Sequence, residues 1–215
     1  MEADNIIVRK YDVKDREAVR KISCDTAFLE NSSAFVDDLE VLADALTMYF
    51  TDFEPGSCFV ACDNGRVVGY LTGAKNIRQM NRVFNAKILP QILSKCFERG
   101  LFFRKKTSKF FLNSLISFLR GEFFAPDFSR QYPAILHINI DKNYRGRRVG
   151  EKLIASFIRF LKENNIKGVH LSTFSEGAKE FFIKQGFKIL FSSKRSYMHY
   201  YLGRYVLCYV LAKNL

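Results

Sequence analysis

The stretch from Ile135 to Gly150 reads Ile-Leu-His-Ile-Asn-Ile-Asp-Lys-Asn-Tyr-Arg-Gly-Arg-Arg-Val-Gly and indicates the fold more strongly than any other part of this 215-residue chain. An apolar, β-branched run typical of a strand ends in a polar turn, and an Arg/Gly-rich loop leads into the amphipathic segment 151–162. A glycine loop at a helix start leaves backbone N–H groups unpaired at the positive end of the helix dipole. The stretch therefore predicts a strand, a phosphate-binding loop and a helix.

The residue types in the loop fit an anion site. Gly146 and Gly150 have no Cβ that would block a close approach by phosphate, and Arg145, Arg147 and Arg148 supply positive charge. The spacing is that of neither common nucleotide loop. It contains no Gly-Lys-Ser/Thr of a P-loop and no three-glycine dinucleotide pattern.

A second motif follows the loop. Residues 166–172 read as a strand, and Ser175-Glu-Gly-Ala-Lys-Glu-Phe-Phe-Ile-Lys-Gln-Gly-Phe187 comes directly after it. Together with the loop, this order resembles the coenzyme A-binding core of GNAT-superfamily N-acetyltransferases. Their loop reads Arg/Gln-x-x-Gly-x-Gly/Ala, from which Arg148 departs. Their second motif reads Asn-x-x-Ala-x-x-Phe-Tyr-x-x-x-Gly-Phe, from which Ser175 and Phe182 depart.

The resemblance implies an α/β fold with a mixed central sheet of about six or seven strands flanked by helices. The rest of the chain fits this order. Asp12 or Asp15 is placed to cap a first helix that runs to about Phe28. The turn Asp63-Asn64-Gly65 predicts a tight hairpin. Further elements are expected as a strand over 5–12, a helix over 37–53, strands over 57–62 and 66–71, and a closing strand over 205–212.

Residues 76–132 depart from the family order and predict a helical hairpin inserted into a single domain of residues 1–215. The helical patterns cover 77–99, with a kink at Pro90, and 107–123. The segment is rich in Phe, Lys and Arg, and four interpretations remain open. Its Phe face packs on the domain with its basic face solvated, or it forms a lid over an apolar acceptor pocket, a dimer surface, or an attachment to an anionic membrane face.

Composition narrows the class of protein. A content of 48% hydrophobic and 26% charged residues is typical of a globular chain, and the net charge of +12 could steer acidic partners. The five cysteines show no metal-type spacing, so we expect reduced thiols and no metal site. Glu2 and Asp4 interrupt any signal peptide, and no stretch is long enough to span a membrane, which favours a cytoplasmic protein. No motif indicates a specific nucleic-acid partner.

The family resemblance implies a site for acetyl-CoA. In that family the strand before the loop splays from its neighbour, and its free main-chain groups bind the pantetheine arm. The N–H of Ile138 is then expected to polarise the acetyl carbonyl. The positions implied to contact the cofactor are Ile138, Asn139, Ile140, Arg145, Gly146, Arg147, Arg148, Val149, Gly150, Ser175 and Phe182.

Candidates for proton transfer are less conventional. His137 and Asn139 fall on the same side of the predicted strand, where His137 is either the general base or a packed structural residue. Phe182 stands where the family usually has a Tyr that protonates the leaving thiolate. The acid is then water or another hydroxyl, with Tyr200 and Tyr201 expected at the acceptor mouth. Other candidates are His170 and His199 for the base, and Tyr197 and Tyr205 for the acid.

Two functions are consistent with these residues. The first is an N-acetyltransferase that moves an acetyl group directly from acetyl-CoA to a primary amine of a small molecule or a protein, with a homodimer possible. The second is a catalytically weak CoA-binding module whose basic, Phe-rich insertion binds a partner or a membrane surface. Ala134 stands where histone-type members keep a glutamate, which argues against a histone lysine as the acceptor.

Overall fold

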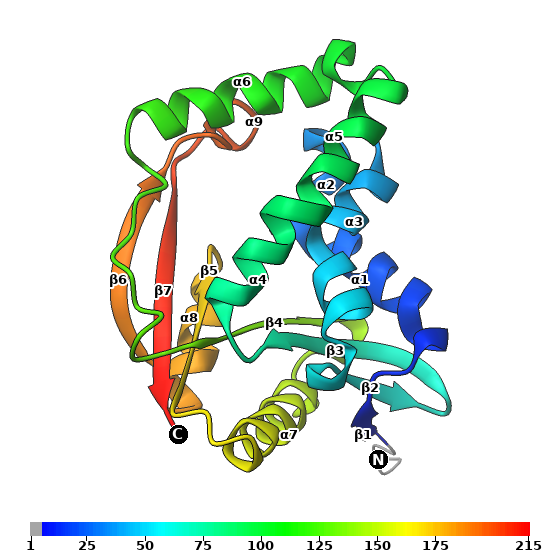
Figure 1. Cartoon of the computed structure of the whole chain (residues 1–215), viewed down its shortest axis with the longest axis vertical. Helices are drawn as coiled ribbons and strands as arrows, with labels where there is room; N and C mark the ends of the chain where they lie inside the picture. The colour runs from blue at the N-terminus through cyan, green and yellow to red at the C-terminus, as the bar shows by residue number, and fades with distance from the viewer. Residues whose placement is uncertain (1–5) are drawn as a thin grey trace.

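A computed structural model describes residues 6–215, which form an α/β fold around a seven-stranded mixed sheet (Figure 1). The parallel neighbours are β4 and β5, and the other neighbouring strands run antiparallel. This architecture confirms the predicted fold class. Across the sheet the strands are β1 (Ile7–Lys10), β2 (Phe59–Asp63), β3 (Arg66–Ala74), β4 (Ala134–Ile140), β5 (Gly168–Thr173), β7 (Val206–Asn214) and β6 (Lys188–Arg195).

The sheet is split between β4 and β5. These strands pair only through Ala134 with Val169 and Ile135 with His170, although both continue well beyond that point. The opposite edge of β4 stays paired with β3 as far as Ile140. The last part of β4 therefore presents one free backbone edge to the opening between the two strands.

Helices cover both faces of the sheet. On one face, Leu153 and Phe157 of α7 (Val149–Glu163) pack into the main core, which α8 (Glu176–Lys184) extends through Phe182. On the other face, Val19 of α1 (Arg16–Glu30) packs on the sheet, next to α3 (Leu39–Met48). The predicted phosphate loop lies at the start of α7. The helices α1 and α3 lie on the opposite face of the sheet.

The N-terminal elements follow the predicted order. Asp12 caps a 3₁₀ turn, Val13–Asp15, that runs directly into α1. Asn5, the expected first residue of β1, lies outside the described residues. Asp38 caps α3 by accepting from the backbone N–H of Val41 at 3.0 Å. The helical path after α3 continues as a π-helical segment, Tyr49–Phe53, and a short helix α2 (Ser32–Phe35) precedes α3.

The predicted helices of the insertion are present, but they do not form a hairpin. The chain runs through α4 (Ile77–Val83), a π-helical segment Phe84–Ile88 and α5 (Leu89–Glu98), and then turns sharply before α6 (Lys105–Leu119). Figure 1 shows α6 crossing the open end of the molecule from α5 toward β6 and α9 (His199–Leu202), instead of returning along α5.

Polar anchoring explains the path of α6. Gly100 ends α5 with a left-handed φ of 62°, and Thr107 then hydrogen bonds with Asp37 before α3. Lys106 also donates to the Ser33 carbonyl of α2 at 2.8 Å. These contacts fix the start of α6 on α2. Pro90 lies in the first turn of α5, directly after the π-helical segment, so its missing N–H falls where the helical hydrogen-bond pattern changes. No helix within residues 6–215 is both long and apolar enough to cross a membrane.

Candidate functional site

A cleft of about 1070 Å³ opens where β4 and β5 separate. Its floor is the free edge of β4, from Leu136 to Ile140, and one end is the loop from Arg145 to Gly150. Aromatic and aliphatic side chains of α3, the π-helical segment after it and the insertion line another part of the cleft, including Leu46, Phe50 and Phe84. The cleft thus joins the predicted phosphate loop to an apolar region on the α3 side.

The loop before α7 leaves several backbone N–H groups without a backbone partner, as predicted. Gly146 has a left-handed φ of 81°, and Arg148, the N-cap residue of α7, has a φ of 58°. Within residues 6–215, no backbone acceptor pairs with the N–H groups of Gly146, Arg148, Val149 or Gly150. This arrangement at a helix start fits a phosphate group.

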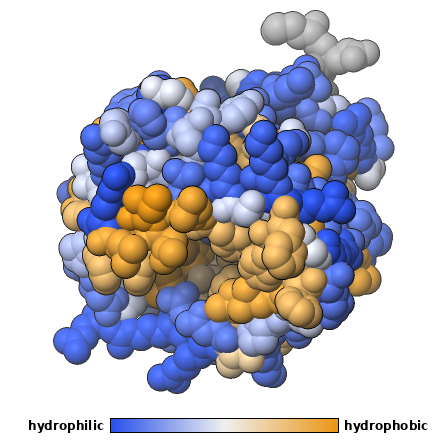
Figure 2. Space-filling model, turned by 90° about the horizontal axis from the view of Figure 1, so that it is seen from above, coloured by the Kyte–Doolittle hydropathy of each residue, from blue (hydrophilic) through white to orange (hydrophobic). Residues whose placement is uncertain are grey.

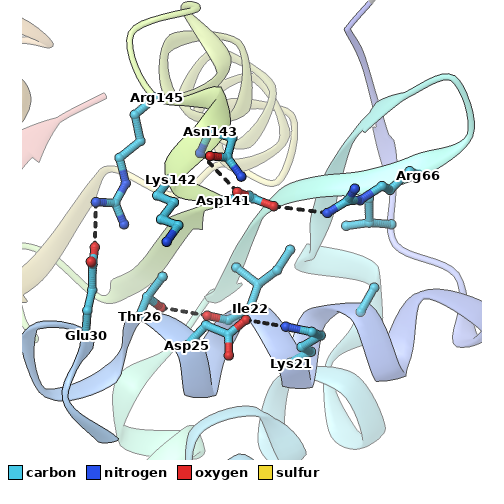
Figure 3. Close-up of a pocket in the computed structure, with 12 residues that line it drawn as sticks. Lys21, Ile22, Asp25, Thr26, Glu30, Arg66, Asp141, Lys142, Asn143 and Arg145 are labelled. Carbon is cyan, nitrogen blue, oxygen red and sulfur yellow. Dashed lines mark hydrogen bonds and ion pairs between the residues drawn. The ribbon is translucent and has the colours of Figure 1, made fainter.

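Arg145 forms an ion pair with the end of α1. Its Nη1 atom lies 2.6 Å from Oε1 of Glu30, and both side chains are about half exposed. Figure 3 shows the two side chains pointing toward one another across the gap between the loop and α1. The three residues Phe28, Leu29 and Glu30 all have left-handed φ values, of 51°, 56° and 68°. The partner of the loop arginine therefore sits on a strained segment that also lines the cleft.

Gly150 has a packing role in addition to the one expected. A Cβ at this position would lie 2.8 Å from Cζ of Phe181 and 3.3 Å from Cδ1 of Ile140. The close neighbours are apolar side chains of α8 and β4, so Gly150 allows the start of α7 to pack against them. The expectation that the missing Cβ also leaves room for phosphate stays a prediction.

Arg148 occupies a backbone conformation that favours glycine, which is the residue of the family loop. An L-residue in the left-handed region costs about 1–2 kcal/mol relative to glycine, partly offset by the extra freedom of glycine in the unfolded chain. We expect Arg148→Gly to raise the free energy of unfolding by about 0.5–1 kcal/mol, which corresponds to a rise in Tm of about 2 °C for a domain of this size. Thermal denaturation measures this difference.

Arg147→Gly is the matched control, because Arg147 is not among the residues with positive φ. The same change of side chain should there lower the free energy of unfolding. If both variants lose stability equally, backbone strain at Arg148 is not relieved by glycine.

His137 and Asn139 lie on the same side of β4, as the alternation predicts. Asn139 Nδ2 donates to the hydroxyl of the buried Tyr70 at 2.7 Å, which fixes the amide orientation. The His137 side chain is open to the cleft, where its ring meets the edge of Phe50 with centroids 5.9 Å apart. Desolvation by the cleft walls, with a smaller contribution from His170, lowers the pKa of His137 below 6.5. A neutral imidazole faces the cleft at neutral pH.

The other two histidines lie away from the cleft lining. His170 is buried in β5, and its Nδ1 lies 2.7 Å from the carbonyl oxygen of Tyr132, which holds the segment before β4. His199 is exposed in α9 and its ring lies 4.5 Å from that of Tyr205. Among the three histidines of the chain, His137 is the one placed to meet a substrate.

Among the candidate tyrosines, too, one lines the cleft and the others do not. Tyr197 lines the cleft near Phe174, and burial raises its pKa. Tyr200 and Tyr201 instead pack around Phe35 of α2, with ring centroids 5.7 and 5.2 Å from it, and neither lines the cleft. The structure thus places the two tyrosines expected at the acceptor mouth beside α2.

The two motif departures in α8 have clear structural roles. Ser175 caps the helix, with its Oγ accepting from the N–H of Ala178 at 3.2 Å. Phe182 is buried and packs against Phe181 and Phe187, while part of it reaches the cleft. A phenyl ring here carries no proton to donate, so any acid must come from another group.

Sequence reasoning missed two contributors to the site. Tyr70 of β3 supports Asn139, and Glu30 pairs with Arg145. The strand alternation of β3 gives a signal for Tyr70, because a polar ring at a buried position needs a partner. Nothing in the sequence indicates Glu30, which reaches the loop only through the irregular end of α1.

The split sheet, the glycine loop at the start of α7 and the capped α8 follow the order that the family resemblance implies. The acetyltransferase (GNAT) family model matches residues 19–187, and the chain belongs to this family. Its class is therefore that of an acyltransferase. No curated protein sequence matches the chain.

Solved structures share the fold over nearly the whole chain. The structure of SsHAT has a TM-score of 0.67 and 24% identity, covering 97% of this chain and 98% of its own. A Drosophila melanogaster polyamine N-acetyltransferase that forms N-acetylagmatine has a TM-score of 0.59 and 16% identity, covering 98% of this chain and all of its own. A ribosomal-protein-alanine N-acetyltransferase from Brucella melitensis has a TM-score of 0.57 and 19% identity, covering 97% of this chain and 99% of its own.

Proposed function

We propose that the protein transfers an acetyl group from acetyl-CoA directly to a primary amine. The observation that carries this proposal is the continuity of the cleft. The unpaired N–H groups at the start of α7, the free edge of β4 and the neutral His137 line one space of about 1070 Å³. A thioester held along β4 would place its carbonyl between a backbone donor and a proton acceptor.

The residues present fit acetyl-CoA. The loop from Arg145 to Gly150 would hold the pyrophosphate through backbone N–H groups, and the free edge of β4 beside Ile138 and Ile140 would hold the pantetheine arm. When bound, acetyl-CoA supplies an activated acyl group on a thiolate leaving group. The N–H of Ile138 is our choice of donor to the carbonyl oxygen.

His137 is proposed to accept the proton of the incoming amine, since desolvation lowers its pKa and keeps the imidazole unprotonated at pH 7. For the departing thiolate we propose Tyr197 as the proton donor, because among the four candidate tyrosines it is the one that lines the cleft. Burial raises the pKa of Tyr197 and so makes it a weaker acid, and it is proposed for its position alone. Tyr197→Phe should lower turnover, whereas Tyr200→Phe, which removes a buried hydroxyl beside α2, should leave it unchanged.

The acceptor side of the cleft favours an amine carried on an apolar body. Its walls there include Leu46, Tyr49, Phe50, Met80 and Phe84. The two carboxylates in the described lining, those of Glu30 and Glu151, belong to the end of the cleft beside the phosphate loop. With no carboxylate on the apolar walls to pair with a second ammonium group, we expect a monoamine to be preferred over a polyamine.

Thiol release from acetyl-CoA tests the proposal directly. We expect release with arylalkyl or long-chain alkyl monoamines and at least 10-fold lower kcat/KM with spermidine or agmatine. A calorimetric titration with coenzyme A runs beside it. If coenzyme A binds but no thiol is released with amines, peptide N-termini or lysine peptides, the proposed acetyl transfer is contradicted.

That last result would support a second function, a coenzyme A-binding module. Phe182 is the observation that favours it, because the position where the family usually has a proton donor carries a buried phenyl ring. The loop and the free edge of β4 serve both functions, so coenzyme A binding alone does not distinguish them.

A further inference from the structure

Helix α6 carries an exposed apolar face at the open end of the molecule. Leu112, Leu115, Phe118 and Leu119 are exposed by 58%, 54%, 52% and 75%. Spacings of three and four residues place these side chains on one side of the helix. Phe124, which follows α6 and is 68% exposed, packs on Phe118 with ring centroids 5.9 Å apart. Figure 2 shows apolar side chains gathered at this end of the molecule, around a hollow.

Positive charge predominates beside this α6 face. The segment 99–121 contains no Asp or Glu. Its exposed cations next to the face are Arg104, Lys105, Lys106, Lys109 and Arg120. Within the described residues none of these five forms an ion pair with a carboxylate, although Asp37 interacts electrostatically with Arg104 and Lys106, and Glu122 with Arg120. Lys106 donates to a backbone carbonyl, Lys109 lies over the ring of Tyr200, and Arg120 donates to Ser196 Oγ.

We propose that the α6 face binds an anionic phospholipid surface, with the helix lying in the plane of the interface. Helices of this kind combine leucine and phenylalanine on one face with lysine and arginine beside it, and anionic headgroups complement the cations. This proposal is independent of the acetyl transfer proposed above.

Two other occupants fit the face less well. A second copy of the chain would bring the same five cations toward their equivalents, so its association through this face would be opposed by like-charge repulsion. A nucleic acid would meet the cations but would leave the exposed leucines in water. α6 is the outermost helix at this end of the fold, which leaves its exposed face accessible to a lipid interface (Figure 1).

The chain contains no tryptophan, which allows a single reporter on the proposed surface. In Phe118→Trp, we expect a blue shift of emission on adding vesicles with 30% phosphatidylserine, and quenching by brominated lipid. Val13→Trp is the matched control, since Val13 is 77% exposed in the turn between β1 and α1, and its emission should not change. Neutral phosphatidylcholine vesicles should give little shift with either variant.

Vesicle sedimentation of the otherwise native chain separates the apolar and ionic contributions. Leu115→Asp/Leu119→Asp and Arg104→Glu/Lys105→Glu should each lower partitioning into anionic vesicles about 10-fold or more. All four side chains are exposed, and acidic residues at the start of α6 favour its helix, so folding should be retained. Lys162→Glu/Lys167→Glu changes the net charge equally at the end of α7 and should bind nearly as wild type.

Three results would overturn the proposal. The first is an unshifted emission of Phe118→Trp with anionic vesicles, whether or not the protein sediments. The second is equal partitioning into neutral and anionic vesicles. The third is a dimer of the wild-type chain, seen by analytical ultracentrifugation without lipid, that Leu115→Asp/Leu119→Asp dissociates, which would assign the face to a second copy.

Discussion

Replacing His137 by Gln is expected to lower turnover about 100-fold while leaving the affinity for coenzyme A unchanged. Loss of a positioned general base typically costs 10²–10⁴-fold, and Gln keeps a polar side chain of similar size in the cleft. The lowered pKa of His137 also sets the direction in which activity should change with pH. Burial lowers the pKa of His137 below 6.5, so the imidazole gains a proton, and activity falls, as the pH drops through that pKa. The wild-type profile should therefore rise at a pH below 6.5, and this rise should disappear in His137→Gln.

His199→Gln is the control, because the same substitution occurs at an exposed histidine outside the cleft lining. It should leave both turnover and the pH profile unchanged. A structural role for His137 would give a different combination of stability and pH dependence. The substitution would then lower Tm through the lost contact with Phe50, and the surviving activity would keep its pH dependence.

Local signals in the sequence were sufficient for most of the fold. The turn Asp63-Asn64-Gly65 predicted the hairpin between β2 and β3, and Asn64 and Gly65 adopt the positive φ values of 47° and 83° that this turn requires. The alternation of β4 correctly placed His137 and Asn139 on one side. Each of these features depends on residues within a few positions of each other.

Features that depend on distant contacts could not be predicted in this way. The helical pattern of 107–123 predicted that α6 forms but not its direction, which depends on the hydrogen bonds between Thr107 and Asp37. The tyrosines after Ser196 were indistinguishable by type, and only the packing of Phe35 separates Tyr200 and Tyr201 from Tyr197. For the same reason, the side chains that crowd Gly150 could not be identified from the loop alone.

The ion pair between Arg145 and Glu30 leads to the second large expected effect. If Arg145 contacts the pyrophosphate of coenzyme A, Arg145→Ala should raise the Kd about 10–100-fold, as expected for a charge-assisted hydrogen bond of about 1.5–3 kcal/mol. Glu30 competes for the same guanidinium group. Glu30→Gln should therefore lower the Kd, by up to about 5-fold, because a half-exposed ion pair contributes only about 0.2–1 kcal/mol. Calorimetric titration measures both effects.

A double-mutant cycle distinguishes competition for Arg145 from a general change in charge. In the Arg145→Ala background Glu30 has lost its partner, so adding Glu30→Gln should leave the Kd nearly unchanged. Asp25→Asn is the control. Asp25 pairs with Lys21 on α1, so this change removes an equal charge from the same helix without freeing a loop arginine. If Asp25→Asn and Glu30→Gln tighten coenzyme A binding equally, the effect is long-range electrostatics. If only Glu30→Gln tightens binding, and only with Arg145 present, then Glu30 at the end of α1 and the phosphate of coenzyme A compete for the Arg145 guanidinium group.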